Sequence, residues 1–268
     1  MRSKQCLSVC LSILFAIPTW ARQIPTPQSI QRDPQAITIL SQILSAAGGM
    51  QALSAVHDVS ATGTVSYNWG DTPVQGNVTV KGRGVAQFRV DASLPDGNRT
   101  WGISNGQRFQ KDPDGTVTVA PYQDPSSFQN ILFPWAHLFI AVQDLSGNIS
   151  YVGLETRNGA SVHHISIVKA TSSGAGATET VKKARSMELF VDSTTGQVQS
   201  IVSVAVSTDF PRQTCPREIA YSDFRPITGV TVPFSIMEVV CGQQTMTIQL
   251  SQISFNNNFT DTDFESSK

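Results

Sequence analysis

The sequence has few of the residues on which catalytic, metal and nucleic-acid sites depend. It has 4 histidines in 268 residues, and no His-x-Glu, His-Glu-x-x-His, Gly-x-Ser-x-Gly or paired-cysteine metal motif. Its 19 basic residues are balanced by 20 acidic ones, without a basic stripe. These absences argue against a catalytic constellation, a metal centre and a nucleic-acid-binding surface. We therefore predict no enzyme activity, no catalytic residues, no metal ligands and no cofactor.

The histidines are also poorly placed to act together. His57 precedes the first predicted strand, and His137 lies in an apolar run. His163 and His164 are consecutive on a predicted strand, where neighbouring side chains face opposite sides. We expect them to have separate surroundings.

Long apolar runs are missing after residue 21, where no segment reaches the roughly 18 apolar residues of a membrane-spanning helix. The chain begins with Arg2 and Lys4, continues with an apolar and small stretch over 6–17, and offers the small residues Thr19 and Ala21 at the cleavage positions. This order is typical of a secretory signal peptide over 1–21. We expect an exported protein, periplasmic or secreted, with no transmembrane span in the mature chain.

Cysteine is scarce, and its placement is informative. Lipidation at Cys10 is disfavoured because Val9, directly before it, is not small. Cys6 and Cys10 would leave with the signal peptide, and the remaining pair, Cys215 and Cys241, predicts one disulfide in an exported protein. The two cysteines are symmetric about residue 228, inside the turn of a predicted hairpin. Facing antiparallel residues have Cα atoms about 4.5–5.5 Å apart, which suits a disulfide.

The rest of the chain reads as one domain over 33–265, after a mobile lead-in over 22–32. Asp33 and Pro34 open an amphipathic helix that Gly48 ends. From about residue 57 the apolar period becomes two, which predicts successive antiparallel strands with one buried face. In the last predicted strand the apolar residues change from even positions, up to Leu250, to odd positions, from Ile253, which indicates a β-bulge near Ser251. The last residues, 261–268, read as a polar end.

A mid-chain segment, 124–144, interrupts the strands with apolar residues at helical spacing and a proline, Pro134. It reads either as a core helix under the sheet or as a helical plug that screens an apolar cavity suited to acyl chains. The residues predicted to line that cavity or its plug are Phe88, Trp101, Phe128, Ile131, Leu132, Trp135, Leu138 and Phe139.

Three segments in the C-terminal half resemble the periplasmic outer-membrane lipoprotein carrier (LolA/LolB-like) superfamily. They are the hairpins "MELFVDSTTGQVQSI" and "YSDFRPITGVTVPFSI" and the closing strand "IQLSQISFNNNFTDTDFE". The resemblance implies a mainly β fold with a few helices (α+β), in which a strongly curved antiparallel sheet, an unclosed β-barrel, wraps helices over a hydrophobic cavity. The chain departs from the carriers in extra material around 91–125 and 171–180, and in lacking a convincing lipid-anchor cysteine.

Three functions remain open from the sequence. The first is an exported, non-enzymatic envelope protein that binds an acyl chain, a lipid or a lipoprotein, with transient contacts to envelope proteins. The second is an interaction or scaffold domain with a filled core, marked by an exposed apolar patch on an edge strand. The third, an envelope hydrolase, needs a convergent polar site that the sequence does not provide.

Overall fold

A computed structural model describes residues 30–68, 72–84, 87–104, 107–119, 134, 138, 147–168, 186–206 and 214–266 of the chain. Two α-helices come first, α1 (Pro34–Ala46) and α2 (Gly49–Ser54). Thirteen strands follow, with the bounds β1 (Asp58–Tyr67), β2 (Val74–Arg83), β3 (Gln87–Leu94), β4 (Gly97–Ser104), β5 (Gln107–Lys111), β6 (Val117–Val119), β7 (Asn148–Arg157), β8 (Ala160–Val168), β9 (Ser186–Asp192), β10 (Val198–Val206), β11 (Thr214–Ile227), β12 (Val230–Val240) and β13 (Gln243–Phe255). A 3-10 helix, η1 (Asp261–Phe264), comes last.

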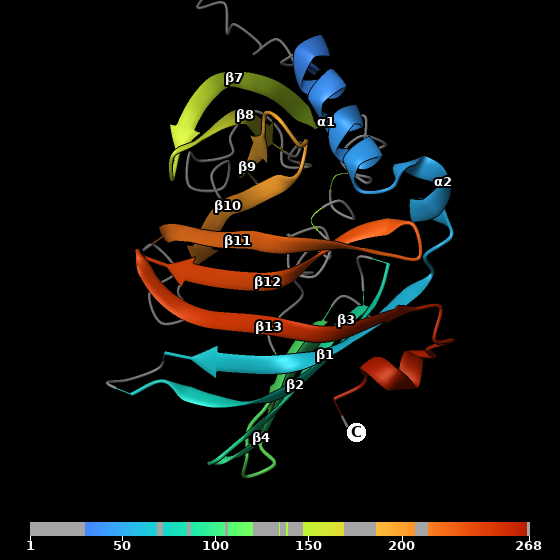
Figure 1. The fold of residues 1–268 in the computed structure, drawn as a ribbon. Helices are drawn as coiled ribbons and strands as arrows, with labels where there is room; N and C mark the ends of the chain where they lie inside the picture. The colour runs from blue at the N-terminus through green and yellow to red at the C-terminus, as the bar shows by residue number, and fades with distance from the viewer. Residues whose placement is uncertain are drawn as a thin grey trace, which may run out of the picture.

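The strands form one antiparallel sheet in the order β6-β5-β4-β3-β2-β1-β13-β12-β11-β10-β9-β8-β7. The order is that of a meander except at one place, where β13 returns to pair with β1. β6 and β7 are the two edges, so the sheet is open rather than closed. The sheet twists so strongly that β3 and β4 cross behind β1 and β2 in Figure 1. The predicted fold class, a curved antiparallel sheet with a few helices, is confirmed.

The predicted N-terminal helix is confirmed as α1. The Asp33 carboxylate accepts the Gln35 backbone N–H at 2.8 Å, and Pro34 occupies the first turn. The apolar stripe Ala36, Ile39, Leu40, Ile43 and Leu44 is buried. Ahead of the helix, the Ile149 N–H on β7 donates to the Gln31 carbonyl and the Asp33 N–H donates to the Ile149 carbonyl, so that Arg32 forms a parallel bridge to Ile149.

The end of α1 is docked against the β11–β12 hairpin. Gly48 has a φ of 123°, and α2 begins directly after it, a helix that the sequence analysis did not predict. A Cβ on Gly48 would meet the Gly229 carbonyl oxygen at 2.2 Å, and the Thr231 N–H donates to the Ala47 carbonyl at 2.9 Å. Glycine is therefore needed here both for its φ and for the close approach of two backbones.

The sheet has one face buried in the main core and one outer face. On β1 to β3 the inward residues are those of the predicted alternation, including Val65, Val80, Phe88 and Val90. Leu138, from the mid-chain apolar segment, is fully buried in the same core. The side chains of α1 also join this core, so helix and sheet share one hydrophobic interior.

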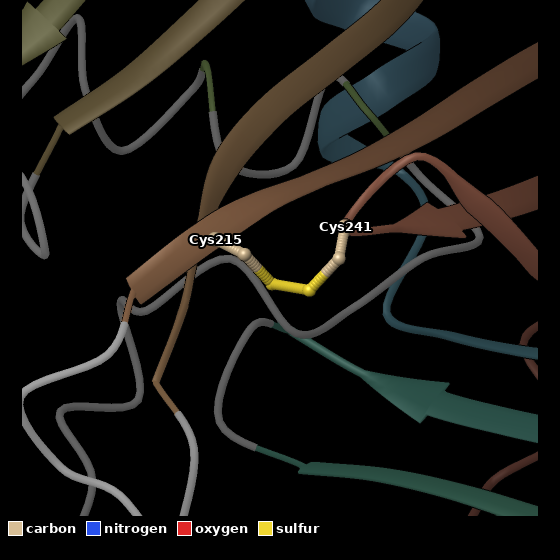
Figure 2. Close-up of a disulfide and its surroundings, with 2 residues drawn as sticks. All are labelled: Cys215 and Cys241. Carbon is tan, nitrogen blue, oxygen red and sulfur yellow. A yellow bond between two sulfur atoms is a disulfide. The ribbon is translucent and has the colours of Figure 1, made fainter.

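The disulfide between Cys215 and Cys241 is present, with Cα atoms 5.2 Å apart (Figure 2). The register nevertheless differs from the predicted one by one residue. Ile227 pairs with Val230, so the hairpin is centred between Thr228 and Gly229 rather than on residue 228. Cys241 consequently lies just past the end of β12, in the turn to β13, and does not face Cys215 across two strands.

The predicted bulge in the last strand is confirmed. Thr62 pairs with Gln252 and Gly63 with Leu250, which leaves Ser251 as the extra residue on β13. The Ser251 hydroxyl donates to the Thr62 carbonyl at 3.1 Å. Because of the bulge, the inward-facing residues of β13 are even-numbered up to Leu250 and odd-numbered from Ile253, as the sequence pattern predicted.

The expectation of a merely polar end is wrong, because η1 packs on the outer face of the sheet. Phe264 is fully buried, and η1 contacts β3 and β4. Arg83 donates to the Asp261 carboxylate and to the Phe259 carbonyl, and it also lies against the Phe264 ring. The burial of Phe264 was not predicted, because the residues around it in the sequence are polar or charged.

A buried carboxylate fastens the segment that leads to η1. Asp58, 4 % exposed, accepts the Asn257 N–H at 2.6 Å and the Phe259 N–H at 3.0 Å. Burial alone would raise the pKa of Asp58, but the hydrogen bonds from Asn257 and Phe259 together lower it below its ordinary value. The ionised carboxylate therefore stabilises the C-terminal segment against β1.

Candidate functional site

Three of the eight predicted cavity residues fall within the described part of the chain. Phe88 and Leu138 are fully buried in the main core, and Trp101 packs against it while remaining partly exposed. The structure therefore brings Phe88 and Trp101 together, with ring centroids 5.4 Å apart. The other five, Phe128, Ile131, Leu132, Trp135 and Phe139, lie outside the described residues.

Trp101 extends across the inner face of the sheet. It pairs with Val90, a core residue, so its side chain points to the same inner side. Its indole N–H donates to the Tyr67 hydroxyl on β1 at 3.2 Å. Burial raises the pKa of the Tyr67 phenol, the hydrogen bond from Trp101 lowers it, and the net change is upward. The phenol is therefore neutral at physiological pH.

Beyond Tyr67 the inner face becomes charged. Tyr67 pairs with Met246 on β13, which pairs with Glu238 on β12. The Glu238 carboxylate accepts the Arg217 Nε–H at 2.6 Å and the Thr245 hydroxyl at 2.7 Å. The side chains of Arg217 and Glu238 are 21% and 17% exposed, so this ion pair is largely shielded from water.

A second arginine, Arg108, lies on β5. It pairs with Ile103, which pairs with Phe88, so Arg108 also points inward. Arg108 is exposed to solvent, yet the surrounding protein displaces enough water to lower its pKa, and the charge of Arg217 lowers it further.

We call this set the inner-face site: Phe88, Trp101, Ile103 and Arg108 from one side, and Tyr67, Arg217 and Glu238 from the other. Its apolar members are Phe88, Trp101 and Ile103, and its charged members are Arg108, Arg217 and Glu238. Arg108, Arg217 and Glu238 were not among the predicted site residues. The signal for Arg217 was the alternation Arg217, Ile219, Tyr221, which places an arginine at an inward position of its strand.

Among the histidines that the structure describes, His163 and His164 do not converge on a catalytic arrangement, and His137 lies outside the described residues. Tyr151 and His163 lie 3.1 Å apart, hydroxyl to Nδ1, whereas His164 contacts Glu155 and Glu188 at 2.6 and 3.0 Å. Their opposite orientations confirm the prediction for the two neighbours. In the part of the chain that the structure describes, no three His, Cys, Asp or Glu residues are arranged to hold a metal ion.

Several hollows lie outside the inner-face site. One of about 460 Å³ lies over the outer face of β2 to β5 and is lined by charged and polar residues such as Arg89 and Asp91. An apolar groove of about 410 Å³ runs between α2, the β11–β12 tip and the end of β13. By contrast, the gap between α1, Pro134 and Phe224 holds only about 10 Å³, so α1 is closely packed where it crosses the hairpin.

Comparisons with known proteins identify the class of fold. No family model matches the sequence, and no curated protein matches it. Among solved structures, a LolA superfamily protein from Nitrosomonas europaea aligns with a TM-score of 0.53 at 10% identity, over 86% of this chain and 97% of that one. This chain therefore has a LolA-like fold, as the resemblance in its hairpins implied.

Two further solved structures have the same arrangement. A domain described as an outer membrane lipoprotein-sorting protein from Vibrio parahaemolyticus aligns with a TM-score of 0.51 at 8% identity, over 87% of this chain and 97% of that one. A DUF1329 family protein from Desulfovibrio piger gives 0.54 at 11% identity, over 88% and 99%. At such identities the likeness establishes the fold and leaves function to the site.

Proposed function

We propose that this protein is an exported, non-enzymatic carrier that binds an acyl chain, free or as part of a lipid or lipoprotein, at the inner-face site. The observation that carries the proposal is the accessibility of Trp101 and Arg108. Both side chains point to the inner face of the sheet, beside the apolar residues Phe88 and Ile103, where complete packing would bury them. Space on an apolar face with a few polar groups is what an apolar ligand with one polar end requires.

The fold supports the same reading. One of the similar structures is described as a lipoprotein-sorting domain and another as a LolA superfamily protein, and both align over most of this chain. The proposal extends to export by the signal peptide over 1–21, a mature domain over 33–265, and work in the periplasm. Within the described residues no helix is long and apolar enough to cross a membrane.

The test is native mass spectrometry of the mature protein, purified from the cell envelope without detergent. We expect co-purified lipid in the wild type and its loss in Trp101→Ala, which removes the largest partly exposed side chain of the inner-face site. Leu154→Ala is the matched control, since Leu154 is 59% exposed on edge strand β7. Both variants should keep the wild-type circular dichroism spectrum.

A wild-type protein that is empty, and that also fails to take up a fluorescent fatty acid, would contradict the carrier function. Loss of lipid in Leu154→Ala but not in Trp101→Ala would move the binding site away from the inner face.

A second candidate function, an interaction domain, is favoured by one observation. Val152 and Leu154 on the edge strand β7 are 54% and 59% exposed, which is the apolar edge that such a domain would present. If this edge binds protein, Leu154→Lys should abolish a complex captured from the envelope while leaving lipid content unchanged. The carrier proposal instead requires that Trp101→Ala lose the lipid and keep any such protein complex.

A further inference from the structure

We propose that the hollow on the outer face of β2 to β5 binds an acidic sugar, a hexose with a carboxylate or a phosphate, and that Lys111 holds the anionic group. The hollow has a volume of about 460 Å³, which is in the usual range for small-molecule sites. It lies on the opposite face of the sheet from the inner-face site. The inference therefore goes beyond the proposed carrier function and does not depend on it.

The register of the strands places the polar side chains of the hollow in two adjacent rows. The first row crosses β2 to β5 in the order Thr79, Asp91, Thr100 and Lys111. The second row crosses β2 to β4 in the order Asn77, Ser93 and Asn98. These side chains point outward, because Val78 and Ala92, which alternate with them, belong to the inner core. With the strand spacing of about 4.8 Å and rows about 7 Å apart, the rows cover about 7 by 14 Å.

An ion pair fixes the floor of the hollow. Arg89, only 6% exposed, donates from Nε to one Asp91 oxygen at 2.8 Å and from its terminal nitrogen to the other at 2.8 Å. The Thr100 hydroxyl donates to the same carboxylate at 2.7 Å. Asp91 is therefore neutralised and its oxygens are occupied, so an anion in the hollow would meet little repulsion from it.

Lys111 carries the unpaired charge of the hollow. In the part of the chain that the structure describes, its ammonium group makes no hydrogen bond and no ion pair. The other charged side chains of the lining are paired, Arg89 with Asp91 and Arg99 with Asp96. The whole chain has a formal net charge of −1, so this charge is a local feature and not part of a basic surface.

Neutral hydrogen-bonding groups surround this charge. The side chains of Asn77 and Thr79 are accessible and make no hydrogen bond within the described ranges. The Asn98 side-chain oxygen accepts the Ser93 hydroxyl at 2.9 Å, which leaves the NH2 group of Asn98 available to a ligand. Amide and hydroxyl groups both donate and accept, so they can bind sugar hydroxyls in either role.

The combination of groups selects the class of ligand. An ammonium group binds a carboxylate or a phosphate, and the amide and hydroxyl groups beside it bind hydroxyls. An acyl chain does not fit here, because the apolar residues of the lining, Val78 and Ala92, face the core. An acidic sugar has both an anionic group and hydroxyls. It can be a single sugar or one unit of an acidic glycan, since the two rows are longer than one sugar ring.

The test is a ligand-observed NMR titration of the mature protein with galactose, galacturonate, galactose 6-phosphate and trigalacturonate. We expect the two anionic monosaccharides to bind at least about tenfold more tightly than galactose, as a charge-assisted hydrogen bond allows. Acetate, a carboxylate without hydroxyls, should bind at least about tenfold more weakly than galacturonate. Tighter binding of trigalacturonate than of galacturonate would support a glycan as the ligand, and equal binding would support a single sugar.

Lys111→Gln should remove the preference for the anionic sugars, whereas Lys111→Arg should keep most of it. Asn77→Ala should weaken the binding of galacturonate and leave that of acetate unchanged. Arg225→Gln is the matched control, because it removes one positive charge from β11, several strands away from the hollow. All four variants should keep the wild-type circular dichroism spectrum.

Equal affinities of the wild type for galactose and galacturonate would overturn the inference, as would a preference that survives Lys111→Gln. Acetate that binds as tightly as galacturonate would also overturn it, because the hollow would then bind anions without recognising a sugar. None of these results bears on the carrier function, since the titrated ligands have no acyl chain.

Discussion

Trp101 on β4 donates a hydrogen bond to Tyr67 on β1 at 3.2 Å, although β2 and β3 lie between these strands. Neighbouring strands are about 4.8 Å apart, and Trp101 is in register with Ala61 of β1, six residues before Tyr67, so a flat sheet would separate the two positions by roughly 25 Å. The contact is therefore a direct consequence of the curvature of the sheet. It also brings the polar end of Trp101 toward the charged residues of the inner-face site.

The disulfide should contribute measurably to stability. Cys215 and Cys241 are 26 residues apart, and closing a loop of this length stabilises by about 3–4 kcal/mol in the chain-entropy model. We expect the free energy of unfolding of the Cys215→Ser/Cys241→Ser double variant, measured in urea, to be lower than that of the wild type by up to that amount. The wild type with reductant should match the variant. Equal stability of oxidised and reduced wild type would contradict a stabilising bond.

Asp58 should make stability depend on pH in the acidic range. Because its pKa is lowered in the folded state, its contribution is complete above the unfolded pKa of about 4 and is lost as the pH falls through the folded pKa. We expect Asp58→Asn to cost about 1–3 kcal/mol at pH 7, measured by denaturant unfolding.

The difference between the wild type and Asp58→Asn should narrow below about pH 4. Asp114→Asn is the control, because Asp114 accepts the Thr116 N–H in an exposed turn and should cost much less. A difference that stays constant between pH 7 and pH 3 would show that the charge of Asp58 is not what stabilises the segment.

Phe264 should matter as much as a residue of the main core. It is fully buried where η1 packs on β3 and β4, and Phe→Ala changes at buried sites cost about 3–5 kcal/mol. We expect Phe264→Ala to fall in this range by thermal or denaturant unfolding. Leu154→Ala, at an exposed apolar position, should stay within about 0.5 kcal/mol of wild type. A neutral Phe264→Ala would mean that η1 does not pack on the sheet in solution.

Gly63 should not accept a side chain. A Cβ there would lie 2.1 Å from the Gln249 carbonyl oxygen and 2.7 Å from the Leu250 Cα, next to the bulge at Ser251. Since both neighbours are backbone atoms, we expect Gly63→Ala to cost about 1–3 kcal/mol in unfolding experiments. The neighbouring exposed change Thr64→Ala should be nearly neutral. If the two variants were equally stable, the close approach of β1 and β13 would be wrong.

The elements predicted well are those whose signals lie close together in the sequence. Asp33 and Pro34 mark the start of α1, and the alternation around Phe88 identifies both the strand and its buried face. The bulge at Ser251 could be read from one change of parity. The hairpin was placed within one residue, and the disulfide was predicted although the cysteines do not face each other.

The local pattern of the sequence determined the strands, the first helix and the cysteine pair, because period, caps and turns act over a few residues. Only the tertiary structure decided that Trp101 reaches Tyr67, that Arg217 pairs with Glu238, and that Phe264 is buried. Each of these contacts depends either on the twist accumulated over several strands or on the return of a segment to a distant strand. Neighbouring residues alone determine neither the accumulated twist nor the place to which a segment returns.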